Sequence, residues 1–83
     1  METKEQFKKS LDELGVKINL LTKDAADQYK KQVQDLKDLW ISLKDKWDLM
    51  IAQGGEVWEN VKESFRDRLS ELQEMYDTLM KKF

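Results

Sequence analysis

Four serines carry hydroxyl groups that could act as nucleophiles, but the sequence contains no histidine to activate them. They are Ser10, Ser42, Ser64 and Ser70. A serine becomes a strong nucleophile when a neighbouring base takes its proton, and histidine is the usual base. The chain contains neither histidine nor cysteine, and its two adjacent glycines lack the strand-to-helix setting of a phosphate-binding loop. The sequence therefore predicts that the protein is not an enzyme.

Paired carboxylates are the next residues whose spacing could do chemistry. Glu59 and Glu63 would share one side of a helix, as would Glu71 and Glu74. A metal site in a helical bundle combines glutamates with Glu-x-x-His segments on facing helices. Because the chain has no histidine and these acids lie off the apolar face, we expect neither a metal site nor a bound cofactor.

Three tryptophans raise the question of an aromatic ligand pocket. Trp40 and Trp47 are two helical turns apart on one face, and Trp58 follows the glycine pair. Large aromatic side chains commonly fill a core, with the indole N–H finding a partner at the core's edge. We therefore predict that the tryptophans belong to the core and not to a ligand site.

The elements that must position these residues are indicated by apolar residues that recur every three or four positions on both sides of Gly54 and Gly55. Such spacing keeps side chains on one face of a helix. Residues at equal distances before and after the glycines pair into layers, as an antiparallel helical hairpin requires. We expect a long helix over residues 4–53, a turn at Gly54-Gly55 and a shorter helix over residues 56–82. The paired series is Ala25, Tyr29, Val33, Leu36, Trp40, Leu43, Trp47 and Met50 before the turn, and Trp58, Val61, Phe65, Leu69, Leu72, Tyr76, Leu79 and Phe83 after it.

A further apolar stripe occupies the N-terminal part of the expected long helix. The tetrad Thr3-Lys4-Glu5-Gln6 has the spacing of a capping box and predicts the start of the helix. The stripe then continues in phase with the hairpin series as far as Ala25. Its residues are Phe7, Leu11, Leu14, Ile18 and Leu21.

Two arrangements would bury this N-terminal stripe. In the first, the long helix is unbroken, and its overhanging stripe packs against another copy, most simply in a dimer with a four-helix core. In the second, the chain breaks near residues 15–22, at Gly15 or Thr22, and residues 4–20 fold back as the third helix of a bundle. One glycine inside a helix costs only about 1 kcal/mol relative to alanine, so Gly15 does not force a break. The unbroken phase of the stripe favours the first arrangement.

The apolar face is also wider than a two-helix seam needs. A strict seam uses two positions in about seven, whereas bundle helices use three or more. The extra apolar side chains would be left in water by an isolated hairpin, which again favours an intermolecular bundle. The residues off the main stripe are Leu39, Ile41, Leu49, Ile51, Val57, Met75 and Met80.

Length and composition limit the remaining classes. The 83 residues are expected to form a single all-helical domain over residues 1–83, and the absence of proline fits long helices. A net charge of −2 gives no electrostatic case for nucleic acid. The N-terminus lacks the apolar segment of a signal peptide and no run is long enough to span a membrane, so we expect a cytoplasmic protein.

Two segments of the chain have a distinctive pattern: Tyr29-x-x-Gln32-Val33-x-x-Leu36-Lys37 and Gly54-Gly55-Glu56-Val57-Trp58-Glu59-Asn60-Val61-Lys62. They resemble a family of small bacterial coiled-coil proteins that are often labelled stress-response or uncharacterised. In that family a long charged helix is followed by a Gly-Asp-Ala-Trp-Glu-type turn and an amphipathic helix. The sequence departs from the family at Leu14-Gly15, where the family has a tryptophan, and at Trp40 and Trp47, where it is rich in alanine and charge. The resemblance implies a stress-related helical protein and no particular reaction.

Together these patterns predict a non-enzymatic helical scaffold that self-associates through its apolar stripe, with a homodimer favoured and a further protein partner unidentified. The alternative is a protein that binds a membrane surface through amphipathic helices carrying tryptophan and phenylalanine. Such helices usually have a polar face rich in lysine and arginine. Acids and bases are balanced along this chain, which favours the scaffold.

Overall fold

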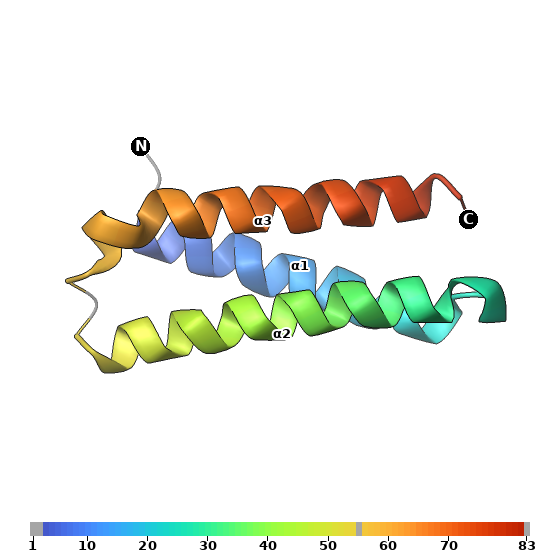
Figure 1. The fold of residues 1–83 in the computed structure, drawn as a ribbon, viewed down its shortest axis with the longest axis horizontal. Helices are drawn as coiled ribbons and strands as arrows, with labels where there is room; N and C mark the ends of the chain where they lie inside the picture. Colours follow the sequence, from blue (N-terminus) through green and yellow to red (C-terminus); the bar gives the residue numbers. More distant parts are fainter. Residues whose placement is uncertain (1–2, 55, 83) are drawn as a thin grey trace.

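The computed structural model describes residues 3–54 and 56–82, and nearly all of them are helical. This part of the chain forms three α-helices: α1 over Lys4–Asp24, α2 over Lys30–Ala52 and α3 over Trp58–Met80. The helices lie side by side in an elongated body measuring 42 × 23 × 16 Å (Figure 1). The prediction of an all-helical protein is confirmed.

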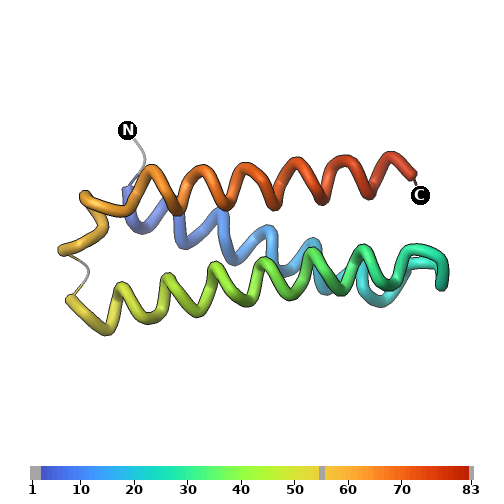
Figure 2. The backbone as a smooth tube through the Cα atoms, viewed as in Figure 1, coloured from blue at the N-terminus to red at the C-terminus, as the bar shows by residue number. Residues whose placement is uncertain are grey.

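The prediction of one unbroken helix over residues 4–53 is wrong, because α1 ends at Asp24. Ala25 and Ala26 have an extended backbone, with ψ angles of 135° and 154°. A short 3-10 helix, η1, over Asp27–Tyr29 then leads into α2. Figure 2 shows the chain reversing its direction here, so that α2 runs back alongside α1.

The alternative break near residues 15–22 also misplaces the end of the helix, since Gly15 and Thr22 both lie inside α1. The Thr22 hydroxyl donates a 2.9 Å hydrogen bond to the carbonyl of Ile18, one turn earlier, and does not cap a new helix. Gly15 faces Trp40 of α2 at a point where a side chain would meet the indole. Both residues are therefore accommodated within a continuous helix.

The start of α1 has the capping box that the sequence predicts. The Gln6 backbone N–H donates to the Thr3 hydroxyl at 3.2 Å, and the Thr3 backbone N–H donates to the Gln6 side-chain oxygen at 2.9 Å. These two bonds satisfy backbone donors that a helix N-terminus otherwise leaves without partners.

The turn between α2 and α3 contains one glycine whose backbone conformation favours that residue. Gly54 has a φ angle of +108°, which L-residues with a side chain rarely adopt. Its N–H donates to the Ile51 carbonyl at 3.0 Å, which satisfies one of the last carbonyls of α2. The second glycine of the expected turn, Gly55, lies outside the described residues. The last helix begins at Trp58, slightly later than the expected residue 56.

One apolar core lies between the three helices, and α1 contributes its most deeply buried side chains. Phe7 and Leu11 are 0% exposed, and Leu14 and Ile18 are 1% exposed. The full set of buried apolar residues is Phe7, Leu11, Leu14, Ile18, Leu21, Val33, Leu36, Leu43, Trp47, Met50, Trp58, Phe65, Leu69, Leu72 and Leu79, and Ala25, Tyr29, Trp40, Val57, Val61 and Tyr76 pack against them while partly exposed. Phe83, the last residue of the expected series, lies outside the described residues.

Burial of the N-terminal stripe explains why the chain turns back after Asp24. Burying one Leu, Ile or Phe side chain contributes roughly 1.5–3 kcal/mol. The five stripe residues together thus contribute about as much as the net stability of a small domain, which is about 5–15 kcal/mol. Ending the helix forgoes a few backbone hydrogen bonds of about 1 kcal/mol each, so burial prevails. Because the stripe is covered within the chain, a second copy would have to bind elsewhere.

Candidate interaction surface

The serines and acids considered for chemistry are spread over the surface of the described part of the chain. Ser10 and Ser70 line one shallow hollow between α1 and α3, whereas Ser42 and Ser64 are exposed on α2 and α3. Within the described residues no charged side chain is buried, and no three acidic side chains are grouped so that they could hold a metal ion. The expectations of no enzyme activity and no metal site stay predictions.

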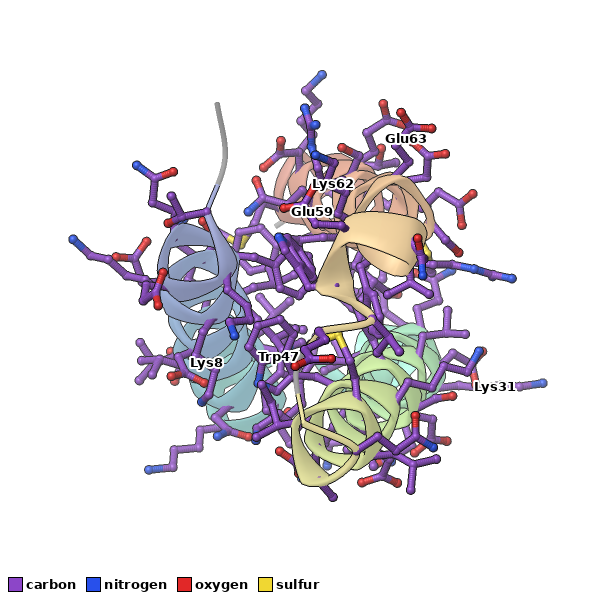
Figure 3. The ribbon with its side chains drawn as sticks, turned by 90° about the vertical axis from the view of Figure 1, so that its left-hand side faces the viewer. Lys8, Lys31, Trp47, Glu59, Lys62 and Glu63 are labelled. Carbon is purple, nitrogen blue, oxygen red and sulfur yellow. The ribbon has the colours of Figure 1, made fainter. Side chains whose placement is uncertain are left out.

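Four aromatic rings gather at the end of the molecule that holds the turn. The ring of Phe7 stacks on Trp47 with centroids 5.1 Å apart, and Trp47 meets Trp58 edge to face at 5.6 Å. Phe65 completes the group, 5.7 Å from Phe7. Figure 3 shows Trp47 directed between the helices, and its side chain is almost wholly buried. These rings fill the core and join α1, α2 and α3 at this end.

Trp40 has a different role, because it connects α2 to the backbone of α1. Its indole N–H donates a 2.8 Å hydrogen bond to the carbonyl of Leu11. A Cβ atom at Gly15 would lie only 2.9 Å from Cε2 and 3.0 Å from Cη2 of the same indole. The indole reaches the Leu11 carbonyl because Gly15 has no side chain, and the contact sets the register of α1 on α2.

Large apolar side chains remain exposed on all three helices. Single exposed apolar residues are normal on a protein surface, so only a continuous group bears on function. The exposed residues are Val16 and Leu20 on α1, Leu39, Ile41, Leu49 and Ile51 on α2, and Met75 and Met80 on α3.

Leu39 and Met75 belong to such a group, because they lie together on the surface groove between α2 and α3. Two adjoining hollows of about 500 Å³ and about 60 Å³ follow this groove, and Met75 lines both. Core leucines of α2 and α3 form the apolar floor. We call this surface the α2–α3 groove; its apolar residues are Leu36, Leu39, Leu43, Leu72, Met75 and Leu79.

The α2–α3 groove lies on the side of α2 and α3 that α1 leaves uncovered. Viewed along the helices, α1 packs to one side of the other two, and Lys31 of α2 extends away from it (Figure 3). The inner faces of α2 and α3 pack against each other and against α1, which contacts both helices. The groove on the opposite side therefore faces solvent.

Five charged side chains line the α2–α3 groove, and two of them, Glu74 and Lys82 of α3, lie beside the larger hollow. Lys46 of α2 and Arg68 and Glu71 of α3 line the smaller hollow. Arg68 and Glu71 lie 4.0 Å apart on the same helix, a loose and exposed ion pair. Such a pair contributes little to stability, because solvent screens it. The rim is thus polar enough to stay hydrated and apolar enough at its centre to bind another surface.

Most residues of the paired series lie in the core or pack against it, but the sequence interpretation did not identify the α2–α3 groove. The signal for it was present, because Leu39 and Met75 lie off the main apolar stripe of their helices. Recognising that these residues share a groove requires knowing that α1 packs on the opposite side of α2 and α3. The expected long helix did not place residues 4–24 there. None of the helices in the described part of the chain is long and apolar enough to cross a membrane.

Comparisons with known proteins give no relative from which a function could be inferred. The chain matches no protein-family model, no curated protein and no solved structure. The resemblance to small bacterial coiled-coil proteins stays a prediction, and function has to be argued from the geometry of the surface.

Proposed function

We propose that this protein is a non-enzymatic helical interaction protein that self-associates as a dimer through the α2–α3 groove. The observation that supports the proposal is the pair of exposed apolar side chains above a floor of core leucines: Leu39 is 45% exposed and Met75 is 38% exposed. Covering apolar surface contributes about 25 cal/mol per Å², so a second protein surface that fills the groove is stabilised there.

In this proposal each chain is a closed three-helix bundle, and the second copy adds to its outside. The N-terminal stripe from Phe7 to Leu21 stays buried within one chain and takes no part in the contact between chains. The dimer interface is formed instead by exposed apolar residues, such as Leu39, that lie outside the core of each chain. In this proposal the buried stripe stabilises each chain, and the exposed apolar residues of the groove bind the second copy.

A groove between two antiparallel helices suits another helix as its occupant. Side-chain ridges of one helix pack into the grooves of a neighbour at interaxial distances of about 8–10 Å. Amphipathic helices commonly bind such grooves through apolar residues spaced three or four apart. The chain itself offers helices of this kind, and a small domain gains stability when it associates.

The mass of the protein in solution tests the proposal. Light scattering behind a sizing column, from low to high micromolar concentration, is expected to show a rise from the chain mass of 9.9 kDa to twice that value. A mass that stays at that of one chain over the whole range would contradict self-association.

Paired substitutions test whether the α2–α3 groove is the surface involved. Leu39→Glu with Met75→Glu places two charges at the centre of the groove and is expected to abolish the dimer while preserving the fold, because both side chains are exposed. The matched control is Val16→Glu with Leu20→Glu, since these residues are 60% and 55% exposed on α1. The control is expected to dimerise as the unmodified protein does. Equal loss in both variants would argue against a specific surface.

A further inference from the structure

Met75 is the methionine that borders the proposed dimer surface. It lines both hollows of the α2–α3 groove, together with Leu39 in the smaller one and Leu79 in the larger one. Among the methionines that the structure describes, Met50 is 4% exposed, Met75 is 38% exposed and Met80 is 42% exposed. Met50 and Met80 line neither hollow of the groove. One accessible thioether thus lies within the groove, and a second of similar exposure lies outside it.

A thioether that is accessible to solvent is open to oxidation by hydrogen peroxide. A lone pair on sulfur attacks one oxygen of the peroxide, an S–O bond forms and the O–O bond breaks. The proton on the transferred oxygen passes to the departing hydroxide, which leaves as water. Sulfur loses two electrons to the peroxide, and a flexible apolar side chain becomes a polar sulfoxide.

A sulfoxide at residue 75 opposes the contact that the groove makes with a second copy. In the free chain, water hydrates its oxygen, because the side chain is exposed. In the dimer that oxygen is covered beside a floor formed by Leu36, Leu72 and Leu79, whose side chains donate no hydrogen bond. A polar group that loses its water without gaining a partner costs free energy, so oxidised chains associate less readily.

Association in turn protects Met75 from the peroxide. A second copy that covers the groove removes this sulfur from solvent, and its oxidation then proceeds only through dissociated chains. Met80 lies outside the groove and stays accessible in both states. The two residues therefore give a comparison within one chain, in which only the reaction at Met75 depends on protein concentration.

We propose that Met75 is a redox-sensitive site that controls self-association. Hydrogen peroxide converts Met75 of the free chain to the sulfoxide, and the oxidised chain no longer pairs through the α2–α3 groove. The inference rests on the proposed function and adds a way in which the same surface is regulated. The change is reversible, because methionine sulfoxide reductases return the side chain to methionine.

The rate of oxidation at each methionine tests the protection. The protein is treated with hydrogen peroxide at concentrations below and above the Kd of the dimer, and its peptides are analysed by mass spectrometry. Cleavage before Asp77 separates the peptide of Met75 from that of Met80. At a total concentration about ten times the Kd, mass action leaves about a fifth of the chains free, so the rate at Met75 is expected to fall about fivefold. The rate at Met80 is expected to stay the same.

Sedimentation of the oxidised protein tests the effect on the dimer. Each interface then carries a sulfoxide from both copies, and the Kd is expected to rise by about 10-fold or more. Treatment with methionine sulfoxide reductases is expected to restore the original Kd. Helical circular dichroism confirms that the oxidised protein is folded.

Leucine substitutions separate the two exposed methionines. Met75→Leu keeps an apolar side chain of similar volume, so this variant is expected to dimerise nearly as well as the original and to ignore peroxide. Met80→Leu removes the sulfur that lies outside the groove. This control is expected to lose the dimer on oxidation as the unmodified protein does.

The possible outcomes separate this inference from the proposed function. Protection of Met75 at high concentration, together with a weaker dimer after its oxidation, supports the redox-sensitive site. A dimer in which Met75 reacts equally fast at every concentration, or whose Kd ignores the sulfoxide, overturns the inference while self-association stands. An unmodified protein that is monomeric at every concentration overturns both.

Discussion

At Gly15 the backbone of α1 approaches the Trp40 indole of α2 more closely than any side chain would allow. The indole N–H then reaches the Leu11 carbonyl at 2.8 Å, a contact between residues far apart in the chain. Glycine in a helix interior costs about 1 kcal/mol relative to alanine. The hydrogen bond and the close packing of the two helices offset that cost.

Gly15→Ala is therefore expected to destabilise the protein, although alanine favours helix. The new Cβ would overlap the indole, and overpacking of this kind costs typically about 1–3 kcal/mol, which exceeds the gain of about 1 kcal/mol in helix propensity. Urea unfolding followed by circular dichroism measures the change in the free energy of unfolding. A variant as stable as the original protein, or more stable, would show that the close approach is not needed.

A second background tests whether Trp40 is the cause. In a Trp40→Leu variant the atoms that the new Cβ meets are gone, so Gly15→Ala is expected to become neutral or stabilising. The difference between the two effects is the coupling energy of residues 15 and 40. Equal effects of Gly15→Ala in both backgrounds would assign the cost to something other than the indole.

The two residues show what sequence alone could supply at this scale. Trp40 could be predicted as a core-edge residue with a partner for its indole, because its spacing and chemistry are local facts. The identity of that partner could not, since Leu11 is brought near by folding. Gly15 was considered as a helix end for the same reason: its contact with Trp40 has no local signature.

At the scale of the elements, the start of α1 is determined by four consecutive residues and its end is not. The Thr3 hydroxyl and the Gln6 side chain satisfy backbone N–H groups reciprocally, which the tetrad predicts. At the other end, Ala25 and Ala26 give no stop signal comparable to glycine or proline, and the apolar stripe stays in phase. The chain leaves the helix there because packing of α1 against α2 and α3 outweighs a few helical hydrogen bonds.

Thr3→Ala is expected to lower the free energy of unfolding by about 0.5–2 kcal/mol, the usual cost of removing an N-cap side chain. Thr22→Ala is the matched control, because its hydroxyl donates to the Ile18 carbonyl, which already accepts within the helix. The control is expected to change stability by less than about 0.5 kcal/mol, as for other surface substitutions. Urea unfolding distinguishes the two, and equal effects would mean that the capping box adds nothing.

At the scale of the whole molecule, most of the periodic apolar residues lie in the core or against it, but the period does not determine which chain covers them. The stripe from Phe7 to Leu21 could be covered by α2 and α3 of the same chain or by another copy, and both satisfy the same pattern. The structure covers it within the chain. The α2–α3 groove follows from that choice, because it is the side of the hairpin that α1 does not occupy.

The α2–α3 groove also distinguishes exposed apolar residues that can bind a second copy from those that cannot. Val16 on the outer face of α1 is more exposed than Leu39, at 60% against 45%, yet it lines neither of the two hollows of the α2–α3 groove. Leu39 and Met75 together flank a continuous apolar floor. The central claim is therefore that a second copy binds at these two residues and leaves the outer face of α1 free.

A distance between spin labels measures this claim most directly, because the chain contains no cysteine and one introduced cysteine is labelled alone. Ser42→Cys places the label beside the smaller hollow of the α2–α3 groove, and Val16→Cys places it on the outer face of α1. In the dimer the account predicts a short distance between the two Ser42→Cys labels and a much longer one between the Val16→Cys labels. A shorter distance at residue 16 than at residue 42, or no dipolar coupling at residue 42 at any concentration, would contradict it.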